Sequence, residues 1–237
     1  MNWNLFQDYF FDSEDMPYLW IIAIIYMLYI GIRLFIEARK SNILNTTQKY
    51  LRSNAVFIVL YSITRSIFLF SNFYMETYPE TYQSIQSFQV LIRIAYIFGL
   101  LGLTLLMYGI ETTFFTTKGK IALLPFITII ITIFIPDYDI FRYTTYVVQF
   151  IVVGIVLALY IKVYLKGVGE IRKMATLNIV GLIALIISLM FDSVLGKQIL
   201  TDANVRFIAY QLPPFILMIG MYCMFKGWKQ QGKSLNK

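Results

Sequence analysis

Three charged residues interrupt apolar stretches of this sequence, and they are the strongest candidates for chemistry. They are Arg65, Arg93 and Asp192. A charge near the centre of a membrane helix costs about 3 kcal/mol on insertion scales, so such residues normally face the bundle interior and mark ligand sites or ion pairs. Two cations and one anion leave a net positive charge. The set therefore favours a small anionic or carboxylate-bearing ligand.

Uncharged polar residues occur at similar depth in the same stretches. Gln89, Arg93 and Tyr96 follow helical spacing and share one helix face. Gln149 and Gln211 occupy the corresponding part of later stretches. We predict a ligand-binding site made of Arg65, Arg93, Asp192, Gln89, Tyr96, Gln149 and Gln211.

A structural interpretation of the same charges stays open. One arginine can pair with Asp192 only to hold helices together, or the charges can extend to the lipid headgroups. Pro213 and Pro214 remove two backbone donors, so they predict a kink in the last apolar stretch. That kink is either a hinge or a static bend.

The residue inventory excludes several kinds of catalysis and cofactor binding. The chain contains no histidine and one cysteine, Cys223. It therefore has no His-based zinc site, no His-ligated haem, no Ser-His-Asp triad and no Fe–S cluster. Opsins attach retinal to a lysine in their last helix, and here the first lysine of that region is Lys226, at the helix edge. We predict that the protein is not an enzyme and binds neither metal nor cofactor.

The elements that must position these residues follow from composition. Of 237 residues, 59% are hydrophobic and 14% are charged, whereas a soluble domain carries about 25% charged residues. The apolar stretches are continuous and not alternating, so they predict helices spanning a bilayer and not barrel strands. We expect an all-α, single-domain, seven-transmembrane helix bundle with spans at about residues 17–38, 54–74, 87–111, 119–136, 143–165, 174–195 and 205–225.

The Lys and Arg residues predict the orientation of these spans. Fifteen of the 20 lie in connecting segments and span ends on one side, three lie in those on the other side, and Arg65 and Arg93 lie well inside spans. Because positive loops stay in the cytoplasm, the N-terminus is predicted outside and the C-terminus inside. The protein is then a multi-pass protein of the cell membrane. Its net charge of +7 reflects this topology, and no nucleic-acid partner is expected.

A weak internal repeat relates the third and last apolar stretches. Ile94-Ala95-Tyr96 and Met107-Tyr108 recur, at the same separation, as Ile208-Ala209-Tyr210 and Met221-Tyr222. This suggests a 3+1+3 duplication of parallel units. Chance matches between apolar helices are the alternative.

The organisation resembles the seven-helix sensory modules of archaea and bacteria. The residues that carry the resemblance are Glu111 ahead of Lys118 and Lys120, and a basic turn at residues 169–173. The resemblance implies a receptor-like module that binds a small ligand in its outer half and acts through a separate cytoplasmic signalling protein. The alternative is a small facilitator or transporter, since the 3+1+3 pattern also resembles the grouping that includes SWEET-type sugar transporters, although their Pro-Gln pair does not occur here. The lipid bilayer is the remaining partner, and no oligomeric state is predicted.

Overall fold

The computed structural model describes residues 17–40, 45–77, 86–115, 117, 119–192, 205 and 210–234. Within these ranges the chain forms seven α-helices and no strands, which confirms the helical fold. The helices are α2 (Tyr18–Ala38), α3 (Asn45–Thr77), α5 (Gln86–Phe114), α6 (Leu123–Ile133), α7 (Tyr138–Lys166), α8 (Gly169–Asp192) and α11 (Leu212–Ser234). Five of them, α2, α3, α5, α7 and α8, are long and apolar enough to cross a membrane.

Several helices extend beyond the predicted spans. α3 begins at Asn45 and not near residue 54, and α8 begins at Gly169, so the predicted basic turn at residues 169–173 is the first turn of a helix. α11 begins at Leu212, which puts Pro213 and Pro214 in its first turn, directly after a turn at Gln211 that separates α11 from helical Tyr210. Proline is tolerated there because the first N–H groups of a helix have no intrahelical acceptor. Residues 193–195 and 206–209 of the predicted spans lie outside the described residues.

The predicted span at residues 119–136 is only partly helical. α6 has 11 residues, or about 16 Å at 1.5 Å per residue, against a hydrocarbon core of about 30 Å. The helix stops before Ile135 because a residue that precedes proline, here Pro136, disfavours the helical conformation. Asp137 then caps α7 by accepting a hydrogen bond from the Ile140 backbone N–H at 2.8 Å.

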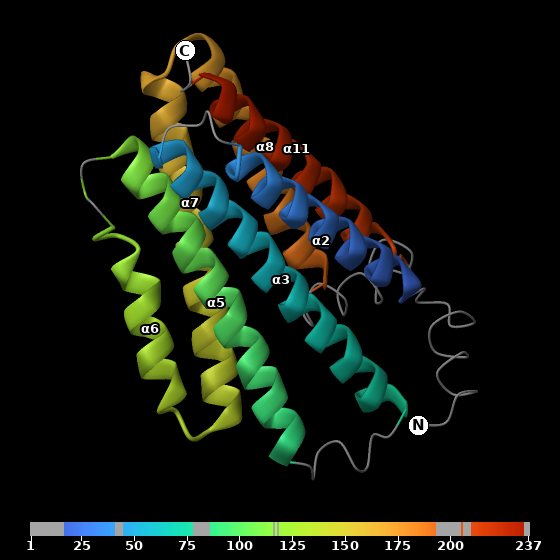
Figure 1. Cartoon of the computed structure of the whole chain (residues 1–237). Coiled ribbons are helices and arrows are strands. Elements are labelled where there is room, and N and C mark those ends of the chain that lie inside the picture. The colour runs from blue at the N-terminus through green and yellow to red at the C-terminus, as the bar shows by residue number, and fades with distance from the viewer. Residues whose placement is uncertain are drawn as a thin grey trace.

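Six helices pack as a closed ring, and α6 lies outside it. α2 packs on α3, α3 on α5, α5 on α7, α7 on α8, α8 on α11, and α11 returns to α2. α6 contacts α5 and α7 and returns the chain along their outer side (Figure 1). We call α2, α3 and α5 the first half, and α7, α8 and α11 the second half. α6 separates the two halves along the chain.

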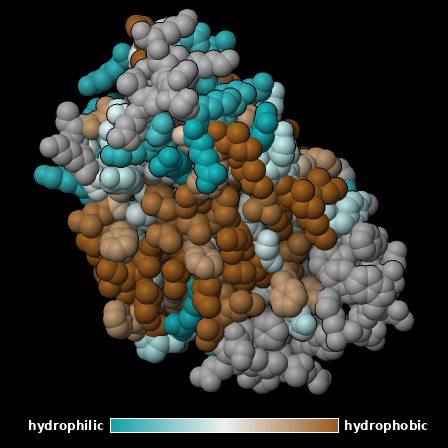
Figure 2. All heavy atoms as spheres, in the orientation of Figure 1, coloured by the Kyte–Doolittle hydropathy of each residue, from teal (hydrophilic) through white to brown (hydrophobic). Residues whose placement is uncertain are grey.

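The outer surface of the ring is apolar in a helical stripe. Large hydrophobic side chains of α2 that are at least half exposed recur every three or four residues, at Ile22, Ile25, Tyr29, Ile32 and Ile36. Figure 2 shows a hydrophobic band across the middle of the bundle, with hydrophilic residues gathered at the end where α7 joins α8. We call this end, which contains Ala38, Asn45, Phe114, Lys166 and Gly169, the basic end. A broad apolar band of this kind is typical of a protein embedded in a lipid bilayer.

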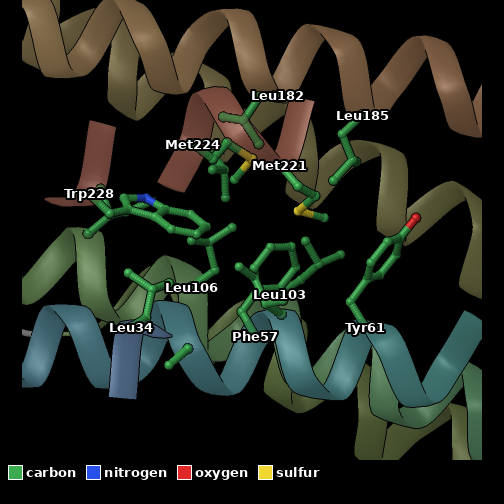
Figure 3. Close-up of a cluster of buried hydrophobic side chains, with 14 of the residues drawn as sticks. Leu34, Phe57, Tyr61, Leu103, Leu106, Leu182, Leu185, Met221, Met224 and Trp228 are labelled. Carbon is green, nitrogen blue, oxygen red and sulfur yellow. The ribbon is translucent and has the colours of Figure 1, made fainter. Parts of the chain in front are cut away.

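The interior is filled by large apolar side chains from both halves. Figure 3 shows Leu106, Leu182, Met221 and Met224 grouped around the indole of Trp228. Every one of these five side chains is less than 2% exposed. The bundle is therefore densely packed toward the basic end.

Glu111 fixes the connection between α5 and α6. Its fully buried side chain accepts hydrogen bonds from the backbone N–H groups of Ile121 and Ala122, each at 3.0 Å. The carboxylate thus satisfies donors that precede the first turn of α6 and would otherwise be unpaired. Glu111, one of the residues behind the resemblance to sensory modules, is consequently buried and not presented to a cytoplasmic partner.

Replacing Glu111 with alanine is expected to loosen the α5–α6 connection at a cost of about 1–3 kcal/mol, because two buried backbone donors lose their acceptor. Hydrogen–deuterium exchange should become faster at residues 119–122. Thr113→Val is the matched control, since the Thr113 hydroxyl bonds only to Gly109 O of its own helix. Equal exchange in both variants would show that Glu111 does not hold this segment.

Candidate ligand-binding site

The centre of the candidate site is a buried ion pair that joins the two halves. Arg65 of α3 donates through Nη2 to the Asp192 carboxylate, at the last residue of α8. The two side chains are 8% and 15% exposed. Their pairing offsets part of the cost of removing each charge from water. The structure thus brings together two of the predicted site residues, across 127 positions of sequence.

The Trp20 indole covers the arginine of this pair. The Arg65 guanidinium carbon lies 3.8 Å from the centre of the Trp20 ring, and Trp20 is itself 9% exposed. A cation stacked on an indole gains electrostatic attraction from the ring face. Trp20 was not among the predicted site residues, although an aromatic residue near the start of the first span is a usual membrane-interface feature.

Tyr61 adds an unpaired polar group next to the ion pair. It lies one helical turn before Arg65 on α3 and is 8% exposed. Its hydroxyl is buried and has no hydrogen-bond partner among the described residues. A buried hydroxyl costs free energy unless it is paired. The arrangement therefore offers one cation, one anion and one free hydroxyl to a bound molecule.

Arg93 is engaged elsewhere. Its guanidinium donates to the backbone carbonyls of Ile135 and Pro136, both at 2.6 Å, and lies 4.9 Å from the centre of the Phe141 ring. These carbonyls belong to the segment between α6 and α7, where proline interrupts the helical hydrogen bonds. Arg93 therefore anchors that segment to α5, and Asp192 bonds to Arg65 and not to it.

Tyr96 lies in an aromatic cluster that connects the surroundings of the two arginines. Tyr96 is 3% exposed. The centre of its ring lies 5.1 Å from the ring centre of Phe68, 5.9 Å from that of Phe141 and 5.4 Å from that of Tyr146. Phe68 is one turn beyond Arg65, whereas Phe141 contacts Arg93. Tyr96 thus packs between α3 and α7.

The three glutamines lie in separate places. Gln149 of α7 faces Gly99 of α5, where an added Cβ atom would lie 3.1 Å from its Nε2 atom and 3.7 Å from Thr64. Gln89 is partly exposed on the first turn of α5, and Gln211 is partly exposed just before α11. Gln149 is therefore placed at the junction of α3, α5 and α7.

A second buried polar group, near the basic end, was missed by sequence reasoning. The Trp228 indole N–H donates to the Tyr160 hydroxyl at 3.1 Å, and the Tyr160 and Tyr50 hydroxyl oxygens are 2.9 Å apart. All three residues are fully buried. They come from α11, α7 and α3, so these hydrogen bonds also join the two halves. Sequence gives one signal for it, since buried Tyr and Trp residues require partners for their polar atoms.

Comparison with known proteins adds no family to this geometry. The chain matches no protein-family model, and no curated protein and no solved structure matches it significantly.

Proposed function

We propose that the chain is a multi-pass membrane protein with its N-terminus outside and its basic end in the cytoplasm. Five helices long enough to span a bilayer, the apolar band and the excess of Lys and Arg at one end support this topology. α6 returns the chain from the basic end to the opposite end (Figure 1), which supports the proposal of seven successive passes even though α6 is short.

Within the membrane, we propose a receptor-like module that binds a small carboxylate ligand in its outer half. The observation that carries this proposal is the buried Arg65–Asp192 pair beneath Trp20. Arginine binds a carboxylate through parallel N–H groups, so a ligand carboxylate is chemically equivalent to the Asp192 side chain. The unpaired Tyr61 hydroxyl adds a donor for the same ligand.

Signalling would follow from the position of the pair. Because Arg65 belongs to the first half and Asp192 to the second, a ligand that replaces Asp192 on Arg65 removes a bond between the halves. A change in their relative position would then reach the basic end, where a separate cytoplasmic protein reads it. A ligand shifts this equilibrium only by its difference in affinity for the two arrangements.

The ligand assay measures the apparent melting temperature of the purified protein with small carboxylates and with their uncharged amides. A carboxylate that binds is expected to raise the melting temperature by mass action. The increase should disappear in Arg65→Gln and persist in Arg93→Gln, the matched control with its own backbone partners. Asp192→Asn should bind the same carboxylate about tenfold more tightly, since the competing charge is removed.

Two outcomes of this assay would contradict the proposal. The first is an equal thermal shift in wild-type protein and Arg65→Gln. The second is no shift with any carboxylate in the wild type and in Asp192→Asn, which would leave the ion pair with a helix-joining role alone.

A second candidate function, a small facilitator, is favoured by the polar groups near the basic end. The polar residues predicted from the sequence lie in the outer half of the membrane, which alone disfavours a continuous polar pathway across it. Asn54 of α3 and Asn178 of α8 are also buried, and both lie toward the basic end, so buried polar residues are not confined to the outer half of the membrane. In a facilitator, the outer ion pair and the Tyr50–Tyr160 contact would open in alternation. Uptake of the binding carboxylate into proteoliposomes separates this function from the receptor, in which ligand binds without crossing.

A further inference from the structure

One hydroxyl proton in the hydrogen-bonded group near the basic end lacks an acceptor among the described residues. The Trp228 indole can only donate, and it donates to the Tyr160 oxygen. The Tyr160 and Tyr50 hydroxyl oxygens, 2.9 Å apart, share one hydrogen bond, and either hydroxyl can donate it. Whichever tyrosine donates, the proton of the other hydroxyl has no acceptor within this group of three residues.

Asn54 lies next to the Tyr50 end of this group and is itself unsatisfied. It is four residues beyond Tyr50 on α3, about one helical turn, so the two side chains lie on the same face of the helix. Asn54 is fully buried, yet neither its Nδ2 nor its Oδ1 atom has a hydrogen-bond partner among the residues described. Such a group costs free energy unless water or another molecule bonds to it.

We propose that a water molecule binds at Asn54 and completes an inner latch, the chain Trp228–Tyr160–Tyr50–Asn54, which holds the two halves together near the basic end. The water bonds to both the Tyr50 hydroxyl and the Asn54 amide, since it can donate to or accept from either group. Buried waters typically make about three hydrogen bonds of this kind. The latch closes the bundle between the membrane centre and the cytoplasm, and it does not depend on ligand binding at Arg65.

The location of the chain supports a latch and not a local packing detail. Tyr50 belongs to α3 of the first half, whereas Tyr160 and Trp228 belong to α7 and α11 of the second. Just outside it, Lys229 of α11 pairs with Glu37 of α2 at 3.3 Å, a second contact between the halves at the same end. Opening the halves at the basic end must therefore break the Tyr50–Tyr160 bond.

The latch is tested by thiol labelling from the cytoplasmic side of inside-out vesicles. The reporter is Leu106→Cys, with Cys223→Ser to remove the native thiol; Leu106 is fully buried and lies beside Trp228 (Figure 3). Tyr160→Phe is expected to raise the labelling rate at least about fivefold, as the loss of one buried hydrogen bond from the closed state implies. Tyr164→Phe is the matched control, because the Tyr164 hydroxyl, one turn away, accepts only from Arg172 at the surface.

Equal labelling rates in Tyr160→Phe and Tyr164→Phe would overturn the latch. If the reporter itself perturbs the core, hydrogen–deuterium exchange on the two tyrosine variants without it gives the same comparison. Exchange should rise in residues 46–54 of α3 only in Tyr160→Phe, and unchanged exchange there overturns the proposal equally.

The water is tested by X-ray radiolytic labelling, which modifies side chains next to bound water even when they are buried. Tyr50 should be modified in the wild type and protected in Asn54→Leu, with buried Phe141 as the unmodified reference. An unmodified Tyr50 in the wild type would overturn the bound water. A rise in melting temperature in Asn54→Leu would do the same, since it marks the removal of an amide that had no partner.

Discussion

Asp192→Ala is expected to destabilise the protein by about 3–5 kcal/mol, one of the largest effects of any single substitution here. The variant leaves the Arg65 guanidinium buried without its carboxylate, and an uncompensated buried charge carries a penalty of that order. The pair is suited to this test because its two side chains are only 8% and 15% exposed. The measurement is the free energy of unfolding of the purified protein in mixed micelles.

The double variant Arg65→Leu/Asp192→Leu provides the control. Removing both charges removes the unpaired group, so the double variant should be closer to wild type than Asp192→Ala is. The single variants Arg65→Leu and Asp192→Leu complete the comparison. If their two losses in unfolding free energy add up to the loss in the double variant, Arg65 and Asp192 do not interact. Recovery of Asp192→Ala by added acetate would further show that the buried arginine accepts a carboxylate from outside the chain.

The positions of the helices were predictable from the sequence, but their ends were not. The predicted end of each span was placed at the charged residues that flank its apolar stretch, such as Arg52 in α3 and Lys226 in α11. The helices continue past these charges, because long basic side chains reach water while their stems stay against apolar surface. Tyr50 and Trp228 therefore fell outside the predicted spans at residues 54–74 and 205–225, and the inner latch was missed with them.

Only the charged residues of the candidate site could be predicted from the sequence. The cost of a charge in an apolar helix singled out Arg65 and Asp192, and the structure pairs them. The same argument grouped Arg93 with them, but its partners are the backbone carbonyls of Ile135 and Pro136. Backbone acceptors carry no sequence signature of their own. The useful signal was Pro136, because a helix that ends before proline leaves its last carbonyls free.

Gly181→Ala is the second substitution with a large expected effect, about 1–3 kcal/mol of destabilisation through overpacking. A Cβ atom added at Gly181 of α8 would lie 2.6 Å from the backbone oxygen of Gly220 in α11, and closer still to the Met224 side chain. Side chains can rotate away, but a backbone oxygen moves only if its helix moves. The variant should therefore lower the melting temperature and separate α8 from α11.

Gly154→Ala is the matched control, because it makes the same chemical change on α7 with nothing within 4 Å of the added atom. Alanine favours a helix over glycine by about 1 kcal/mol, so this variant should be neutral or more stable than wild type. The close approach of α8 and α11 uses one glycine from each helix, Gly181 facing Gly220, whose own added Cβ would lie 2.9 Å from the Gly181 oxygen. If Gly181→Ala is as stable as Gly154→Ala, then α8 and α11 do not pack backbone to backbone. The second half would then be held together mainly by side chains, and its rigid movement as a unit, on which both proposed functions depend, would lose its support.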